Sequence, residues 1–232
     1  MTAAALLLAI GGCATAEPPG TGEGPDARRI DARVTDGSVT DGPLPTDGSV
    51  TDARVIDARI IDAPGCVPVT MQRLVNPSFD ANPVGTGWVE TLIDPMYPLI
   101  TADDGVPEHS APYKLWMGGL PSGDDEARQD ILIPAGTTQL LLRGQYDVRT
   151  AEIFGVFDTS TVDLTTPGNV VLQNALAVDN EDDTTGWTSF QRIFPQTYAG
   201  QTVRLRIRSH NDVSEETSFF YDSLALEATV CQ

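Results

Sequence analysis

The chain has 232 residues, of which 14 are Lys or Arg and 33 are Asp or Glu, so its formal net charge at pH 7 is −19. Within residues 66–232 nine basic residues are outnumbered by twenty-three acidic ones, which argues against nucleic acid as a partner because phosphates repel an acidic surface. Gly, Pro, Asp and Thr are spread so unevenly that only the second part of the chain is expected to build a hydrophobic core.

The first thirteen residues, "MTAAALLLAIGGC", contain an apolar run with the length of a signal-peptide core. This run, from Thr2 to Gly12, is shorter than the roughly 20 residues that cross a bilayer. Its end, "AIGGC", resembles the lipobox of bacterial lipoproteins, in which the cysteine is lipidated and becomes the mature N-terminus. The resemblance implies that Cys13 is a lipid anchor and that the protein is exported to the outer membrane or cell surface. The alternative is a short apolar N-terminus that is trimmed or disordered.

Residues 14–65 carry a repeat in which Asp26, Asp31, Asp36 and Asp41 are five residues apart, and the same step resumes at Asp47. A pentapeptide β-helix would gain only about two coils from so few units. A calcium loop of the EF-hand type needs carboxylates two residues apart, which this spacing lacks. The many Pro, Gly, Ser, Thr and Asp residues and the absence of aromatics predict a disordered linker, or tether, instead.

Residues 66–232 consist of short runs rich in Val, Ile, Leu, Thr and Tyr, separated by Gly, Pro, Asn and Asp, with no helical period of useful length. The strands expected in chain order are "TMQRLV", "GWVETLI", "YKLWMG", "QDILI", "TQLLLRGQYDV", "EIFGVFD", "NVVLQNALAV", "WTSFQRIF", "TVRLRIRS" and "SFFYDSLALEA". About ten strands without intervening helices predict an all-β, antiparallel β-sandwich, which we expect to be a monomer.

Three parts of this domain carry a family resemblance: "LVNPSFDANPVGTGW", "YKLWMGG" followed by "RQDILIPAGTTQLLL", and "YAGQTVRLRIRSHNDVSEETSFFYDSLAL". They are similar to jelly-roll domains of the carbohydrate-binding-module and galactose-binding-like type. The resemblance implies a jelly-roll fold that binds a polysaccharide or cell-surface glycan and is not an enzyme. Two alternatives stay open, a structural or protein-interaction domain without a sugar site and a glycoside hydrolase that uses two carboxylates.

Two cysteines, Cys66 and Cys231, bracket the domain. The two ends of a sandwich often lie on neighbouring strands, and an exported domain folds in an oxidising compartment. The positions therefore predict one disulfide between these residues, with two free thiols as the alternative.

A carboxylate in the apolar stretch "SFFYDSLALEA" needs a partner. Because side chains alternate along a strand, Asp222 is expected to share a hydrophobic face with Phe220 and Leu224. A buried, unpaired carboxylate costs several kcal/mol. The family resemblance implies a structural calcium ion bound by Asp80 and Asp222. The alternatives are that Asp222 accepts hydrogen bonds from backbone N–H groups or pairs with an arginine such as Arg204.

Sugar binding calls for exposed aromatic rings beside planar polar groups, because a pyranose has an apolar C–H face and a ring of hydroxyls. The three tryptophans, Trp88, Trp116 and Trp187, fall where the resembled domains have scaffold aromatics. Tyr97 and Tyr113 lie in a loop-rich segment and are the better aromatic candidates, with turn packing as the alternative.

Polar stripes on two predicted strands supply the remaining candidates. In "LLLRGQYDVR", Arg143 and Gln145 share one side of the strand, and in "TVRLRIRSH" Arg206 belongs to a row of arginines opposite Val, Leu and Ile. These side chains are candidates for donating hydrogen bonds to hydroxyl groups. The alternative is a solvated sheet face with cross-strand charge pairs.

Overall fold

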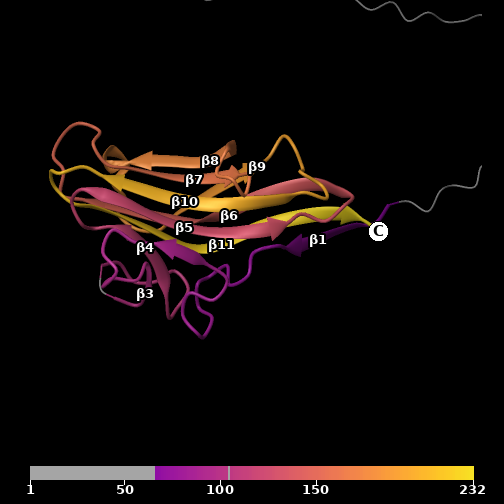
Figure 1. Ribbon diagram of the computed structural model, residues 1–232, viewed down its shortest axis with the longest axis horizontal. Helices are drawn as coiled ribbons and strands as arrows, with labels where there is room; N and C mark the ends of the chain where they lie inside the picture. The colour runs from indigo at the N-terminus through magenta and orange to yellow at the C-terminus, as the bar shows by residue number, and fades with distance from the viewer. Residues whose placement is uncertain (1–65, 104) are drawn as a thin grey trace, which may run out of the picture. The chain divides into compact units, whose positions relative to one another are not determined.

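A computed structural model describes residues 66–103 and 105–232, which form a sandwich of two antiparallel sheets (Figure 1). The expectation of an all-β antiparallel sandwich is confirmed. Within these ranges no helix has the length and hydropathy of a membrane span. The predicted signal segment with Cys13 (residues 1–13) and the predicted linker (residues 14–65) lie outside the described residues.

The six-stranded sheet is organised around its longest strand, β11 (Thr217–Cys231). The other strands follow the order β3 (Ile100–Thr101), β4 (Lys114–Gly118), β11, β6 (Thr137–Thr150) and β9 (Thr188–Ile193), and β1 (Pro68–Gln72) also pairs with β11. One edge of β11 pairs with β4 along its first part and with β1 along its last part. The opposite edge of β11 pairs with β6.

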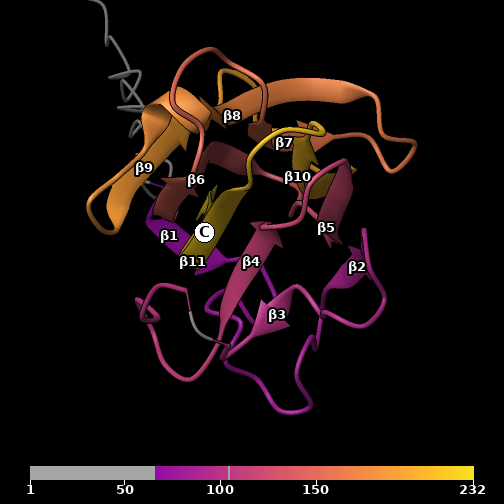
Figure 2. The same cartoon turned by 90° about the vertical axis from the view of Figure 1, so that its left-hand side faces the viewer.

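The five-stranded sheet has the order β2 (Val89–Thr91), β5 (Gly123–Leu132), β10 (Thr202–Asn211), β7 (Thr159–Thr165) and β8 (Val171–Asp179). Figure 2 shows its strands as one layer beside the layer of β4, β11, β6 and β9. Along β10 the side chains of Val203, Leu205 and Ile207 are buried, as the alternation in "TVRLRIRSH" predicts. They pack against the other sheet and form the core with residues such as Leu142 and Phe219.

The prediction that Asp222 shares a hydrophobic face with Leu224 is wrong, because β11 contains a bulge. The register of β11 against β6 shifts between Asp222 and Ala225, and Ser223 has a φ of 50°. Tyr221 belongs to the core before the bulge and Leu224 after it, so the alternation reverses. Asp222 therefore lies on the sheet face that points away from the core, where it is nevertheless fully buried by the loops that cross it.

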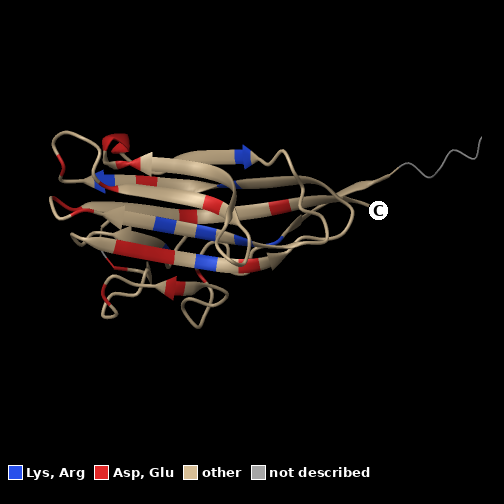
Figure 3. Ribbon diagram, turned by 45° about the horizontal axis from the view of Figure 1, so that its top comes forward, with Lys and Arg blue, Asp and Glu red and all other residues tan. Residues whose placement is uncertain are grey.

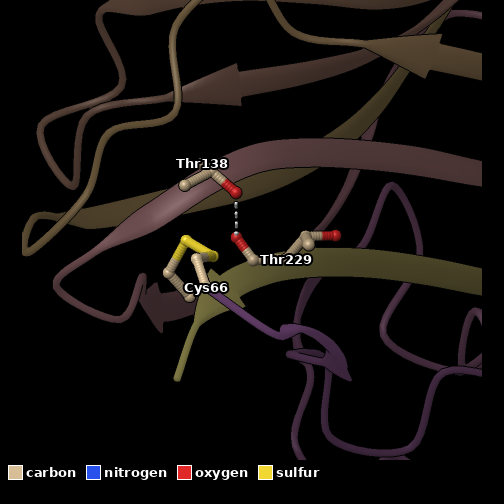
Figure 4. Close-up of a disulfide and its surroundings, with 4 residues drawn as sticks. Cys66, Thr138 and Thr229 are labelled. Atoms are coloured by element: carbon tan, nitrogen blue, oxygen red, sulfur yellow. Dashed lines mark hydrogen bonds between the residues drawn. A yellow bond between two sulfur atoms is a disulfide. The ribbon is translucent and has the colours of Figure 1, made fainter. Parts of the chain in front are cut away.

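The predicted disulfide is confirmed: Cys66 and Cys231 are bonded, with their Cα atoms 5.1 Å apart (Figure 4). The backbones on either side are also paired, because Val67 and Gln232 exchange two N–H···O hydrogen bonds of 3.1 Å. The bridge thus joins the beginning and the end of the sandwich at the end of β11, and it closes a loop with a sequence separation of 165 residues.

Candidate functional site

A hollow of about 280 Å³ lies on the outer face of the six-stranded sheet. Two of its polar side chains come from β6 and two from β9, and the register pairs Arg143 with Gln191 and Gln145 with Ser189. Residues that face each other across antiparallel strands point to the same side of a sheet, so these four polar groups converge. The remaining lining residues are His109, Gly144, Phe190 and Ser223.

Two rings stand beside these polar groups. His109, in the loop before β4, forms a 2.8 Å hydrogen bond through its Nδ1 with the hydroxyl of Ser223 on β11. The ring of Trp187 meets His109 edge-on, with centroids 6.0 Å apart, and its Nε1 donates to the carbonyl of Pro107 at 2.8 Å. Trp187 itself does not line the hollow, but its ring contact with His109, which does, puts the indole one residue away from it.

The electrostatics of the hollow favour a neutral, hydroxylated ligand. Arg143 is about half exposed, and its Nη2 lies 2.7 Å from the carboxylate of Glu227, which raises the pKa of the guanidinium. The positive charge of Arg143 is thus balanced by Glu227, while the other N–H groups of its guanidinium remain free to donate to a ligand. Among the described residues that line the hollow there is no Asp or Glu. The lining of the hollow therefore consists of amide, guanidinium, hydroxyl and ring groups.

The structure separates the other three predicted ligand residues from this hollow. Tyr97 is 55% exposed and lines a different hollow, of about 220 Å³, together with Trp116. Tyr113 packs against the core, and its backbone N–H donates to Asp80. Arg206 lies on β10 in the opposite sheet and pairs with a carboxylate there, that of Asp163. Of the five candidates, only Arg143 and Gln145 come together.

A pair of carboxylates, Asp80 and Asp222, meets at the loop residue Ser110. The backbone N–H of Ser110 donates to Asp222 Oδ2 at 2.7 Å, and its hydroxyl donates to Asp80 Oδ2 at 2.8 Å. Asp222 Oδ1 accepts from the N–H of Ser223. Burial raises the pKa of Asp222 against the effect of these N–H donors, and the nearby charge of Asp80 raises it further. Backbone N–H groups are therefore partners of Asp222.

The arginine considered as a partner for Asp222 is engaged elsewhere. Arg204 Nε lies 2.6 Å from Asp130 Oδ1 on the neighbouring strand β5, so the Arg204 alternative is wrong.

The four carboxylate oxygens of Asp80 and Asp222 are all hydrogen-bonded within the protein. Each oxygen accepts from Ser110, Tyr113 or Ser223, yet a carboxylate has about four lone-pair sites, so acceptor capacity remains. Calcium takes about six to eight oxygen ligands. Within residues 66–103 and 105–232 no group of three or more His, Cys, Asp or Glu side chains is arranged to hold a metal ion. The further ligands would have to be carbonyl groups and waters.

The domain is similar in fold to several solved structures. TmCBM61 in complex with β-1,4-galactotriose matches with a TM-score of 0.46 and 15% identity, over 67% of this chain and 97% of that one. The non-crystalline cellulose specific carbohydrate-binding module CBM28 matches at 0.44 and 10%, over 69% and 99%. Arabinose-bound MgGH51 α-L-arabinofuranosidase matches at 0.41 and 16%, over 69% of this chain and 26% of the enzyme. No family model and no curated protein matches the sequence.

The sequence interpretation missed four residues at the hollow: His109, Trp187, Ser189 and Gln191. Trp187, Ser189 and Gln191 alternate with Thr188 and Phe190 in "WTSFQRIF", and this period of two was available as a signal. No pattern in the sequence pointed to His109, because it lies in a loop and comes next to Ser223 of β11 only in the folded chain.

Proposed function

We propose that the domain binds carbohydrate in the hollow formed by β6, β9 and the bulge of β11. The observation that supports this most is the convergence of Arg143, Gln145, Ser189 and Gln191, with the Trp187 indole close by in contact with His109 of the same hollow. Planar amide and guanidinium groups hydrogen-bond to vicinal hydroxyls, and an indole offers an apolar surface to the C–H side of a sugar ring. No carboxylate among the described residues lines this hollow, which favours binding over hydrolysis.

The size of the hollow favours a short part of a glycan. Its volume of about 280 Å³ lies near the lower end of ordinary ligand pockets, which begin at about 300 Å³. One sugar unit of a longer chain is therefore the natural occupant, with neighbouring units lying along the open sheet face. For a single sugar unit we expect a Kd between micromolar and millimolar, corresponding to about −4 to −8 kcal/mol.

We expect Trp187→Ala to lower glycan affinity by about ten- to a hundredfold, because it removes the apolar platform while the polar groups remain. A glycan array would identify a bound sugar, and isothermal titration with that sugar would measure the loss. Tyr97→Ala is the matched control, since it removes an exposed aromatic from the other hollow and should leave affinity unchanged. Loss of binding in Tyr97→Ala with normal binding in Trp187→Ala would move the site to the loops.

Two alternative functions, a glycoside hydrolase and a structural or protein-interaction domain, would give different results with the same glycans. Release of reducing sugar from a panel of polysaccharides would identify a glycoside hydrolase, which needs two carboxylates at the scissile bond. Absence of binding to every soluble and insoluble glycan tested would favour a structural or protein-interaction domain.

The lipobox-like "AIGGC" supports a second proposal, that Cys13 is lipidated and anchors the protein at the outer membrane or cell surface. Growth with a labelled fatty acid is expected to label the full-length protein, and Cys13→Ser is expected to abolish the label. An unlabelled wild-type protein, or label that persists in Cys13→Ser, would contradict the proposal. Cys66→Ser serves as a control, because it removes a different cysteine and should keep the label.

A further inference from the structure

One end of the sandwich exposes a cluster of large apolar side chains. In the loop between β6 and β7, Ile153, Phe154, Val156 and Phe157 are 88%, 78%, 50% and 42% exposed, and in the turn between β10 and β11 Val213 is 80% exposed. We call these five residues the apolar tip. Single exposed apolar residues are ordinary, but a cluster of five on two adjoining loops marks an interaction surface.

Hydrogen bonds hold the loop that carries most of the tip in a defined conformation. Asn180, only 4% exposed, begins the 3₁₀ turn η1 (Asn180–Asp182). Its Oδ1 accepts from the N–H groups of Phe157 and Asp158 at 2.9 and 3.0 Å, and its Nδ2 donates to the carbonyl of Gly155 at 2.6 Å. The aromatic side chains are thus presented by a supported loop.

The turn that carries Val213 is joined to the same loop. The N–H of Glu215 donates to Glu152 Oε1 at 3.1 Å, and the N–H of Asp212 donates to Asp158 Oδ1 at 2.8 Å. These bonds hold the turn of Val213 against the loop of Phe154, so the five apolar residues lie on two joined loops at one end of the sandwich. A pre-organised surface loses little conformational entropy on binding, which favours affinity.

The loops that carry the apolar tip are rich in acidic residues, although Asp158 among them is buried and Arg149, which pairs with Asp147, lies at the same end of β6. The segments 151–158, 179–183 and 211–216 contain two, four and three acidic residues, and none of them contains Lys, Arg or His. Figure 3 shows acidic residues on the loops and on the short turn at this end of the sandwich. A protein surface that complements the tip must therefore pair apolar contacts at the centre with positive charge at the rim.

The same charge argues against other occupants. Anionic lipid headgroups would be repelled by the acidic rim, and a second copy would bring the same negative rim against it. Residues 1–65 contain ten acidic residues against five arginines, so this segment is also a poor complement.

The tip lies at the end of the sandwich far from the disulfide (Figure 1). The β6–β11 ladder runs from the pair Thr150–Thr217, next to the tip, to the pair Thr137–Val230, next to Cys231.

We propose that the apolar tip docks onto a protein partner that has an apolar socket bordered by Lys and Arg. This inference does not depend on the carbohydrate hollow, which is built from β6, β9 and β11 and shares no residue with the tip. It assigns the domain a second binding function, exerted at the end of the sandwich opposite to the Cys66–Cys231 disulfide.

A displayed library of random peptides, selected on the full-length protein, tests the proposal. Selection is followed by counter-selection on the double variant Ile153→Ser/Phe154→Ser. The enriched peptides are expected to combine net positive charge with aromatic or branched aliphatic residues. Synthetic copies of them are expected to bind wild type at least about tenfold more tightly than the double variant, and to weaken as salt is raised.

Val170→Ser is the matched control, because Val170 is 65% exposed but lies in the turn between β7 and β8, away from the tip. It should bind the peptides as wild type does, and all variants should melt at the wild-type temperature. Enrichment of acidic peptides, equal binding to the double variant, or no enrichment at all would overturn the proposal. Tip-dependent binding to phosphatidylcholine vesicles, or a dimer that the double variant abolishes, would overturn it in favour of lipid or self-association.

Discussion

Loss of the Cys66–Cys231 disulfide is expected to lower the free energy of unfolding by about 2–5 kcal/mol. The bridge closes a loop with a sequence separation of 165 residues, so it removes much of the freedom of the unfolded chain, and the chain-entropy relation sets an upper value of about 5 kcal/mol. For a domain of this size the melting temperature should fall by roughly 5–15 °C. The β1–β11 ladder remains, so the domain should still fold.

Thermal melts of wild type and of Cys66→Ser/Cys231→Ser, each with and without reductant, measure this effect. Reductant should lower the melting temperature of wild type toward that of the double variant and leave the double variant unchanged. Non-reducing peptide mass spectrometry provides an independent readout of the bond. Two alkylatable thiols in the folded, exported protein, or equal melting temperatures for both proteins, would contradict the prediction.

Calcium is expected to stabilise the domain through Asp80 and Asp222, which we propose as two of its ligands. The buried carboxylate of Asp222 has a raised pKa, caused by burial and by the charge of Asp80, so its ionised form is costly in the fold. A divalent cation offsets both the repulsion and the loss of hydration. At a free concentration about a hundred times Kd the gain is about 2.7 kcal/mol, or roughly 5–10 °C in melting temperature.

Melts in calcium and in excess chelator test this proposal. Asp222→Asn should melt at nearly the same temperature in both solutions, because it removes one charged ligand. Asp124→Asn is the control: Asp124 pairs with Arg208 and His210 on the exposed face of the other sheet, so this variant should respond to calcium as wild type does. Identical wild-type melting curves in the two solutions would end the proposal and leave Asp222 held by N–H donors alone.

Local patterns in the sequence were sufficient for the fold class, for the buried face of β10 and for the disulfide. The alternation of Val203, Leu205 and Ile207 with arginines predicts a strand with one buried face, and the structure has it in β10. This works because the period of two belongs to the strand itself. The bracketing cysteines likewise predict a bond that depends only on the two ends of the domain meeting.

Only the tertiary structure decided which way Asp222 points and which polar residues meet. A single bulge at Ser223 reverses the alternation along β11, and nothing local to "FFYDSLAL" marks it. The hollow depends on the register of β6 against β9, which sets Gln145 opposite Ser189. The sequence determined the periodicity of each strand, whereas register and bulges depend on contacts between strands far apart in the chain, and these alone brought Trp187 and His109 together.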